Sequence, residues 1–199
     1  MQLNLIITGV GGQGNVLASQ VLGHAAVHKG LFVTIGETFG LSQRGGPVLS
    51  HIRLSDTALP GPIIPPNAAH MVVGLEPLEP VRILQEFGNE DTVFIVNSRP
   101  IHPLNVIAGD AKYPDDRWLK NTLECFGKKL YWLDATELAI SLGGAIMLNM
   151  IMLGALSEMD GFPISKSDIK DVIRTIFPES KLEMNHKALD LGSKLVQNA

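Results

Sequence analysis

The sequence is poor in charge and in cysteine. Only 18% of its 199 residues are charged and 45% are hydrophobic, whereas soluble domains usually carry about 25% charged residues. Cys125 is the single cysteine, so the chain can form neither an internal disulfide nor a zinc or iron–sulfur site built from several thiolates. The first apolar run, residues 3–7, is short for a signal peptide and follows no basic segment. We therefore expect a cytoplasmic protein.

Basic clusters and membrane-spanning patterns are also missing. The chain has 16 basic and 20 acidic residues and a net charge of −4, and its only adjacent basic pair is Lys128–Lys129. We therefore expect no nucleic-acid partner. Residues 138–156 contain no charge, but Ser141 and Asn149 interrupt this run, Gly143–Gly144 break it, and no basic flank follows. These features favour a buried helix over a membrane span.

Signatures of catalysis are missing as well. The sequence contains no Walker loop, no G-x-S-x-G elbow and no Cys–His signature. His24 and His28 share helical spacing, but no HExxH motif accompanies them. The GDA at residues 109–111 lacks the features that would hold a metal–diphosphate complex. We expect no catalytic residue and no metal ligand, and an isolated chain without activity.

Strand and helix patterns alternate along the sequence. Apolar, β-branched runs predict strands at residues 3–8, 31–36, 48–55, 69–75, 92–98 and 129–135. Helices are expected at residues 15–29, 79–88, 136–156, 166–177 and 182–196, with a long loop over 99–116. Residues 3–36 predict one βαβ unit with parallel strands. The fold class is α/β: an open, mostly parallel Rossmann-like sheet with helices on both faces and a helical C-terminal part, in one domain over 1–199.

A glycine loop joins the first strand to the first helix. Gly9, Gly11 and Gly14 have the spacing of a phosphate-binding loop, in which backbone N–H groups and the helix dipole face the ligand. Glu37 ends the second strand, 23 residues after Gly14, where a dinucleotide site would place its ribose-binding acid. The alternative is that the glycines only allow a tight turn and close packing of the helix on the sheet.

Arg44 stands in an unusually uncharged region. The first 52 residues contain only three charges, Lys29, Glu37 and Arg44. Glycines flank Arg44, and a nearly isolated arginine of this kind favours a subunit interface or a bound anion. The low charge of the region favours a surface that another polypeptide covers, because charged residues are depleted at interface cores.

Two motifs together resemble a known family. They are GVGGQGN at residues 9–15 and QRGG at residues 43–46, about thirty residues apart. The pair, with GALSEM at 154–159 and NHKALDLG at 185–192, resembles the small subunits of 2-oxoacid:ferredoxin oxidoreductases, and most of all those of the indolepyruvate enzymes. The resemblance covers nearly the whole chain and is weakest over 99–135. Asn15 departs from the family, whose members often carry an aliphatic residue there.

The resemblance implies a reaction shared with a partner. A large subunit would hold thiamine diphosphate, Mg²⁺ and [4Fe–4S] clusters, coenzyme A would be the co-substrate, and ferredoxin would accept the electrons. Residues expected at the subunit interface are Glu37, Ser42, Gln43, Arg44, Gly45 and Gly46. Residues expected to bind coenzyme A or another phosphate ligand are Gly9, Gly11, Gly12, Gln13, Gly14 and Arg44.

Two other functions stay open at this point. One is an independent NAD(P)- or flavin-binding oxidoreductase, which Gly9, Gly11, Gly14 and Glu37 would suit. The other is a purely structural subunit. The pattern of Glu37, Gln43 and His51 favours an arylpyruvate substrate, and pyruvate, 2-oxoglutarate and branched-chain 2-oxoacids remain alternatives.

Overall fold

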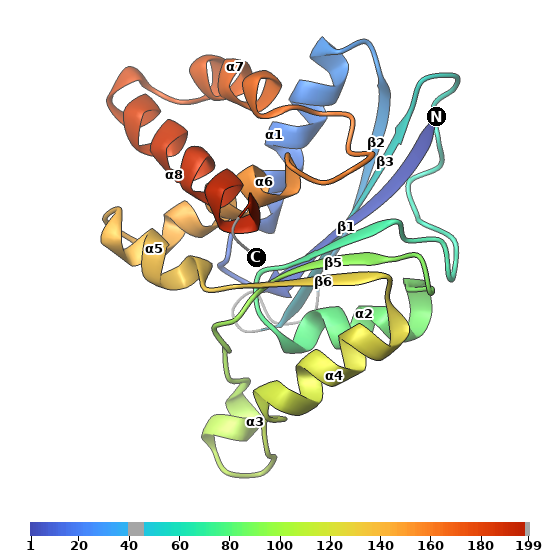
Figure 1. The fold of residues 1–199 in the computed structure, drawn as a ribbon, viewed down its shortest axis with the longest axis vertical. Coiled ribbons are helices and arrows are strands. Elements are labelled where there is room, and N and C mark those ends of the chain that lie inside the picture. Colours follow the sequence, from blue (N-terminus) through green and yellow to red (C-terminus); the bar gives the residue numbers. More distant parts are fainter. Residues whose placement is uncertain (40–45, 198–199) are drawn as a thin grey trace.

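A six-stranded sheet lies between two layers of helices (Figure 1). The computed structural model describes residues 1–39 and 46–197. The strand order is β2-β3-β1-β4-β5-β6. The strands are β1 (Gln2–Val10), β2 (Phe32–Phe39), β3 (Pro47–Ser55), β4 (Met71–Gly74), β5 (Val93–Asn97) and β6 (Lys129–Leu133).

The sheet is mostly parallel, as the sequence predicted. β1, β4, β5 and β6 pair in parallel, whereas β3 is antiparallel to both β1 and β2. β1 and β2 run in the same direction, as expected for the βαβ unit over residues 3–36, and β3 lies between them in the sheet. Seven residues lie between Phe39 and Pro47, too few for a parallel crossover, so β3 turns back along β2.

Each face of the sheet has its own helical layer. α1 (Asn15–His28), α5 (Ala135–Ser141), α6 (Leu148–Leu156), α7 (Lys166–Ile176) and α8 (Glu179–Gln197) lie on one side, and α2 (Leu78–Phe87) and α4 (Asp116–Phe126) lie on the other. Along β1, Leu5 and Ile7 join the apolar cluster of the first layer, and Ile6 joins that of the second. Burial on both faces explains why β1 is apolar almost throughout.

The helical segment expected over residues 136–156 consists of α5, a 3-10 turn at Ala145–Met147 and α6. Gly143 and Gly144, with φ of 109° and 156°, make the turn, and side-chain-bearing residues rarely adopt these angles. All nine residues of α6 are buried. Within the described ranges, we find no helix that meets the length and hydropathy required for a bilayer span.

Two helices lie where the sequence predicted none. α3 (Leu104–Ile107) interrupts the expected loop over 99–116, and α4 begins at Asp116, where that loop was expected to end. Asp115 caps α4 by accepting a hydrogen bond of 2.8 Å from the Trp118 N–H. Leu119 and Leu123 bury the inner side of α4 against the sheet, so the cap and the apolar spacing were the signals of this helix.

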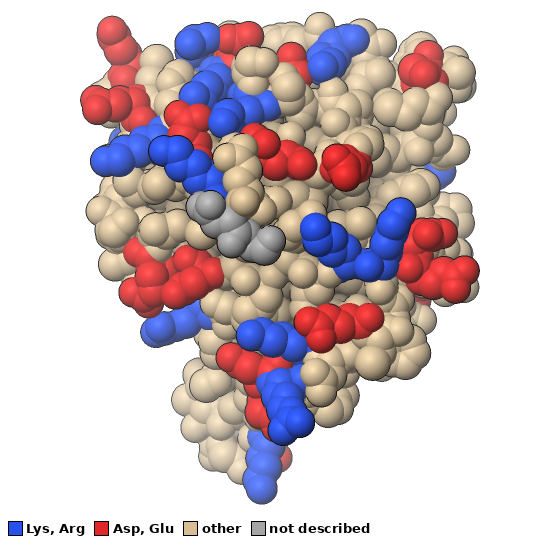
Figure 2. Space-filling view, viewed as in Figure 1, with Lys and Arg blue, Asp and Glu red and all other residues tan. Residues whose placement is uncertain are grey.

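Ion pairs connect the helices of the first layer. The Lys170 ammonium lies 2.7 Å from Asp190 and so links α7 to α8, and Lys29 lies 2.9 Å from Asp168 and links α1 to α7. On the face shown in Figure 2, Lys and Arg are interspersed with Asp and Glu. Basic and acidic side chains therefore alternate on this face and form no broad basic surface there.

Candidate functional site

The glycine loop lies at the carboxyl end of β1, where the connections change sides of the sheet. β1 leads through residues 11–14 into α1 on one face, whereas its parallel neighbour β4 leads into α2 on the other face. In open α/β sheets, ligands bind in the crevice at such a point. The glycine loop therefore lies at the position in the sheet where a ligand site is expected.

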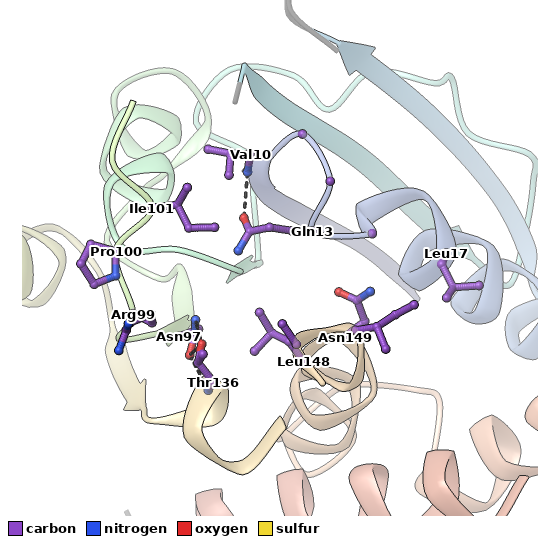
Figure 3. A pocket seen from close by; sticks show the side chains of 15 residues that line it. Val10, Gln13, Leu17, Asn97, Arg99, Pro100, Ile101, Thr136, Leu148 and Asn149 are labelled. Atoms are coloured by element: carbon purple, nitrogen blue, oxygen red, sulfur yellow. Dashed lines mark hydrogen bonds between the residues drawn. The ribbon is translucent and has the colours of Figure 1, made fainter. Parts of the chain in front are cut away.

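Gln13 spans this crevice with its own side chain (Figure 3). Its Oε1 accepts a 2.8 Å hydrogen bond from the Val10 N–H, and its Nε2 donates one of 2.8 Å to the Leu75 carbonyl. A Cβ at Gly9 would lie 2.5 Å from the Gln13 Oε1, so Gly9 makes room for this amide. The structure thus uses Gln13, predicted as a phosphate-binding residue, to join the ends of β1 and β4.

A cavity of about 590 Å³ opens beside the loop (Figure 3). The loop forms one wall, the chain after β5 forms the second, and the start of α6 with the turn before it forms the third. The lining residues are Val10, Gly11, Gly12, Gln13, Gly14, Leu17, Asn97, Arg99, Pro100, Ile101, Thr136, Ala145, Ile146, Leu148 and Asn149. Of the predicted glycine-loop residues, Gly11, Gly12, Gln13 and Gly14 therefore line the cavity, and Gly9 does not.

Most polar groups of the wall are already paired. The Asn97 Nδ2 donates to the Leu75 carbonyl at 3.0 Å and to the Thr136 Oγ1 at 2.9 Å, and its Oδ1 accepts from the Thr136 N–H at 3.2 Å. Arg99 is the only charged residue among the described residues of the lining; it is exposed at the rim, 3.4 Å from Glu137. The remaining side chains are mainly apolar, so the interior suits a neutral ligand group.

Asn149 is the exception, and the sequence analysis did not assign it to a site. It is 1% exposed, and its Oδ1 has no hydrogen-bond partner among the residues that the structure describes. Gly14, at φ 84°, faces it, and a Cβ at Gly14 would lie 2.2 Å from the Asn149 Nδ2. The sequence signal was present, because Asn149 interrupts an otherwise apolar run.

A second, smaller cavity of about 260 Å³ lies on the other side of the loop, against β3. Asn15 lines it: its Nδ2 donates to the carbonyls of Ile7 and Val48 at 3.3 and 3.4 Å. Its Oδ1 is buried and finds no partner within residues 1–39 and 46–197. Gly46, a predicted interface residue, accepts a 2.8 Å hydrogen bond from the Gly11 N–H. Gly46 is thus attached to the loop, whereas Ser42, Gln43, Arg44 and Gly45 lie outside the described residues.

Glu37 lies farther from the loop. It is on β2, and β3 separates that strand from β1. Its Oε1 accepts a 2.8 Å hydrogen bond from the Ser19 Oγ of α1. The structure therefore brings Glu37 to the side of α1 and not directly to the crevice between β1 and β4.

Two buried carboxyl groups lie on the α2 side of the crevice. Burial raises the pKa of Glu79 to about 7, although Arg82, 2.5 Å away, acts in the opposite direction. Burial also raises the pKa of Glu76, whose Oε1 accepts from the Glu79 N–H and whose Oε2 accepts from the Tyr113 hydroxyl at 2.8 Å. These contacts attach the segment before α4 to the start of α2. Among the residues of 1–39 and 46–197, no group of three or more His, Cys, Asp or Glu could hold a metal ion.

Comparisons with known proteins give a consistent result. A family model described as pyruvate ferredoxin/flavodoxin oxidoreductase matches residues 4–195. The indolepyruvate oxidoreductase subunit IorB of Thermococcus kodakarensis is 39% identical over 194 residues, covering 97% of this chain and 95% of that protein.

Solved structures share the fold. The gamma subunit of a keto/oxoacid ferredoxin oxidoreductase from Geobacter sulfurreducens has a TM-score of 0.71 at 21% identity, with 99% of each chain covered. The 2-oxoglutarate:ferredoxin oxidoreductase of Magnetococcus marinus, solved with 2-oxoglutarate, coenzyme A and succinyl-CoA, has a TM-score of 0.75 at 21% identity. The match covers 100% of this chain but only 31% of that longer chain.

Proposed function

This chain belongs to the pyruvate ferredoxin/flavodoxin oxidoreductase family, as a small subunit of the indolepyruvate oxidoreductase type, and from this premise we propose that it serves an enzyme that oxidatively decarboxylates an arylpyruvate. In this reaction the 2-oxoacid loses CO₂, coenzyme A forms an acyl-CoA, and ferredoxin takes up the electrons. The observation that carries the proposal is the 39% identity to an indolepyruvate oxidoreductase subunit over 97% of this chain. The other 2-oxoacids named above are the alternative substrates.

The proposal assigns the reaction centre to a larger partner. Thiamine diphosphate, when bound, stabilises the carbanion left by decarboxylation, and iron–sulfur clusters require several thiolates. This chain offers one exposed cysteine, Cys125, and none of its described residues form a metal-binding group. These residues do not fit either cofactor, so the proposal routes no chemical step through this chain, and the isolated chain is inactive.

The chain's own part in the proposal is to bind coenzyme A and to dock on the partner. Gly11, Gly12 and Gly14 stand before a 14-residue helix, whose N-terminus attracts anionic groups. The related Magnetococcus marinus enzyme holds coenzyme A. Arg44 and its neighbours 42–46 would complete the phosphate contacts or the interface. A nicotinamide dinucleotide is disfavoured, because the Gln13 side chain occupies the crevice between β1 and β4.

A pull-down with activity assays tests the proposal. The tagged full chain is recovered from extract of its own cells, the bound polypeptides are identified by mass, and ferredoxin reduction by the complex is measured with indolepyruvate, pyruvate and 2-oxoglutarate. We expect a large, cysteine-rich, thiamine-binding partner in fixed ratio, and coenzyme A-dependent turnover fastest with indolepyruvate. Recovery of the chain alone with a bound dinucleotide would overturn the proposal. Turnover fastest with pyruvate would overturn only the arylpyruvate assignment.

A further inference from the structure

We infer that Tyr113 is a positioning residue for the 590 Å³ cavity: the bond of its hydroxyl to Glu76 holds the chain after β5 in place as one wall. Residues 99–101 form that wall (Figure 3), and residues 98–115 are called the wall segment below. Tyr113 acts on the wall through other residues and does not line the cavity itself. The inference rests on the proposed function in one respect, namely that this chain binds coenzyme A.

The wall segment leaves the body of the protein between its two ends. It begins at Ser98, whose N–H donates to the Leu133 carbonyl at 2.8 Å, and it ends at Asp115, the cap of α4. Between these ends α3 projects beyond the rest of the molecule (Figure 1). The ion pair of Arg99 with Glu137, at 3.4 Å, is exposed on both sides, and such pairs stabilise little. A buried contact between the two ends would therefore fix the segment.

Glu76 provides the buried side of such a contact. It is 1% exposed, its Oε1 accepts from the Glu79 N–H at the start of α2, and its Oε2 accepts from the Tyr113 hydroxyl at 2.8 Å. Burying a carboxyl group costs free energy unless its oxygens are paired. Tyr113 therefore supplies one of the partners that this buried group requires, and the wall segment is attached to α2 as a result.

The backbone beside Glu76 also holds the other parts of the cavity. The carbonyl of Leu75, the preceding residue, accepts from the Gln13 Nε2 at 2.8 Å and from the Asn97 Nδ2 at 3.0 Å. Gln13 belongs to the glycine loop, and Asn97 ends β5; both line the cavity. The anchor of the wall segment and the anchor of the glycine loop are therefore adjacent residues of one chain segment.

A ring contact carries the position of Tyr113 to the wall. The Tyr113 and His102 rings have their centroids 5.0 Å apart. His102 directly follows Ile101, which lines the cavity. Loss of the Tyr113 hydroxyl bond would therefore release both the ring contact and the wall beside it, without removing any group from the cavity lining.

Tyr113→Phe removes only the hydroxyl, and hydrogen exchange with steady-state kinetics measures the result. In the full chain we expect amide exchange over residues 98–108 to become about tenfold faster, with a smaller change in the buried α6. In the pulled-down complex, the KM for coenzyme A should rise about tenfold and kcat should stay within about twofold, because the complete wall is then present for only part of the time.

Two further variants accompany this substitution. Tyr131→Phe is the matched control, because Tyr131 is the only other tyrosine of the sequence and lies on β6 with its ring 4.3 Å from the Lys129 Nζ; it should leave exchange and KM unchanged. His102→Ala, at an exposed position, removes the ring contact and should raise both in the same direction as Tyr113→Phe.

Three outcomes would overturn the inference. They are unchanged exchange over residues 98–108 in Tyr113→Phe, an equal acceleration in α6, which would indicate general destabilisation, and a KM for coenzyme A that stays at the wild-type value. A wild-type complex that turns over without coenzyme A would sink the proposed function instead, and the exchange result alone would then decide whether Tyr113 holds the wall.

Discussion

The amide of Gln13 joins two strands beyond the point where their backbone pairing stops. The parallel register of β1 and β4 ends at Thr8 and Gly74, and the two hydrogen bonds of Gln13 then connect Val10 to Leu75. The glycine at position 9 is explained by this contact, because a side chain there would meet the amide. The loop thus has a structural role of its own, beside any ligand that it binds.

Replacing Gln13 by alanine should therefore destabilise the fold. We expect Gln13→Ala to lower the free energy of unfolding by about 1 to 3 kcal/mol, because the Val10 N–H loses its partner in a partly buried place. Urea unfolding of the full chain measures the change. Gln20→Ala, at an exposed position of α1, should change stability by no more than about 0.5 kcal/mol; an equal effect of the two substitutions would contradict the bridging role.

Glu79 should make stability depend on pH. Its pKa in the folded chain is about 7, above the ordinary value of 4.5, so between these pH values the folded chain holds a proton that the unfolded chain has lost. The stability linked to this proton is fully present below pH 4.5 and is lost as the pH rises through 7. Glu79→Gln should remove this loss, which amounts to roughly 3 kcal/mol at most.

Chemical denaturation at pH 5 and pH 8 gives the comparison. We expect the wild-type chain to lose more stability than Glu79→Gln between these two values, because Gln does not ionise. Glu86→Gln, at an exposed position of α2, serves as the control and should follow the wild type. Parallel curves for wild type and Glu79→Gln would contradict the raised pKa.

At the scale of secondary structure elements, α6 and α8 cross at unusually short range. Gly154 of α6 faces the Leu189 carbonyl of α8, and Gly192 of α8 faces the Ile151 carbonyl of α6. A Cβ at Gly192 would lie 1.7 Å from that carbonyl oxygen. The two glycines allow the helix backbones to touch, which explains why both belong to the sequence motifs of the C-terminal half.

Gly192→Ala should separate the two helices. The added methyl group meets backbone, which cannot rotate away, so we expect a loss of about 2 to 4 kcal/mol in the free energy of unfolding. Gly23→Ala in α1 is the matched control, because its Cβ would meet the flexible end of Ile35 at 2.9 Å and the gain in helix propensity offsets part of the cost. A thermal melt of each variant reports the difference, and similar melting temperatures would contradict the close crossing.

Strands and helices with strong patterns were predictable from the sequence, and the elements that depend on spatial context were not. β1 and α1 follow directly from a β-branched run and a glycine loop, and the α/β class is confirmed. The crossover unit of β1, α1 and β2 was predicted correctly, but the insertion of β3 between its two strands was not, because β3 comes later in the chain and only its short connection to β2 indicated an antiparallel neighbour. α4 was missed because weak similarity over 99–135 left its Asp115 cap unrecognised.

The glycine spacing predicted a loop between the first strand and the first helix, and the structure has this loop between β1 and α1, because the spacing reflects a local backbone requirement. That the loop binds a ligand stays a prediction. Asn149 lies 135 positions after Gly14 in the chain, and only the packing of α6 against α1 brings the two together. A cavity wall made of residues this far apart in the chain leaves no local pattern in the sequence.

At the scale of the whole molecule, the proposed docking on a larger subunit would depend on residues around Arg44. We expect Arg44→Ala to weaken binding to the partner by about 2 to 5 kcal/mol, the usual loss when one member of a buried charged contact is removed. Titration of the chain against the purified partner measures the affinity. Arg117→Ala, at an exposed position of α4 on the other layer, should bind normally; normal binding by Arg44→Ala would show that the interface lies elsewhere.

The crossing of α6 and α8 also constrains the order in which the core forms. α6 has no exposed residue, and α8 covers it through Leu189 and Gly192. Until α8 has been synthesised and packs on α6, the apolar surface of α6 lacks its cover. During that interval α6 is a target for chaperones that bind exposed apolar segments.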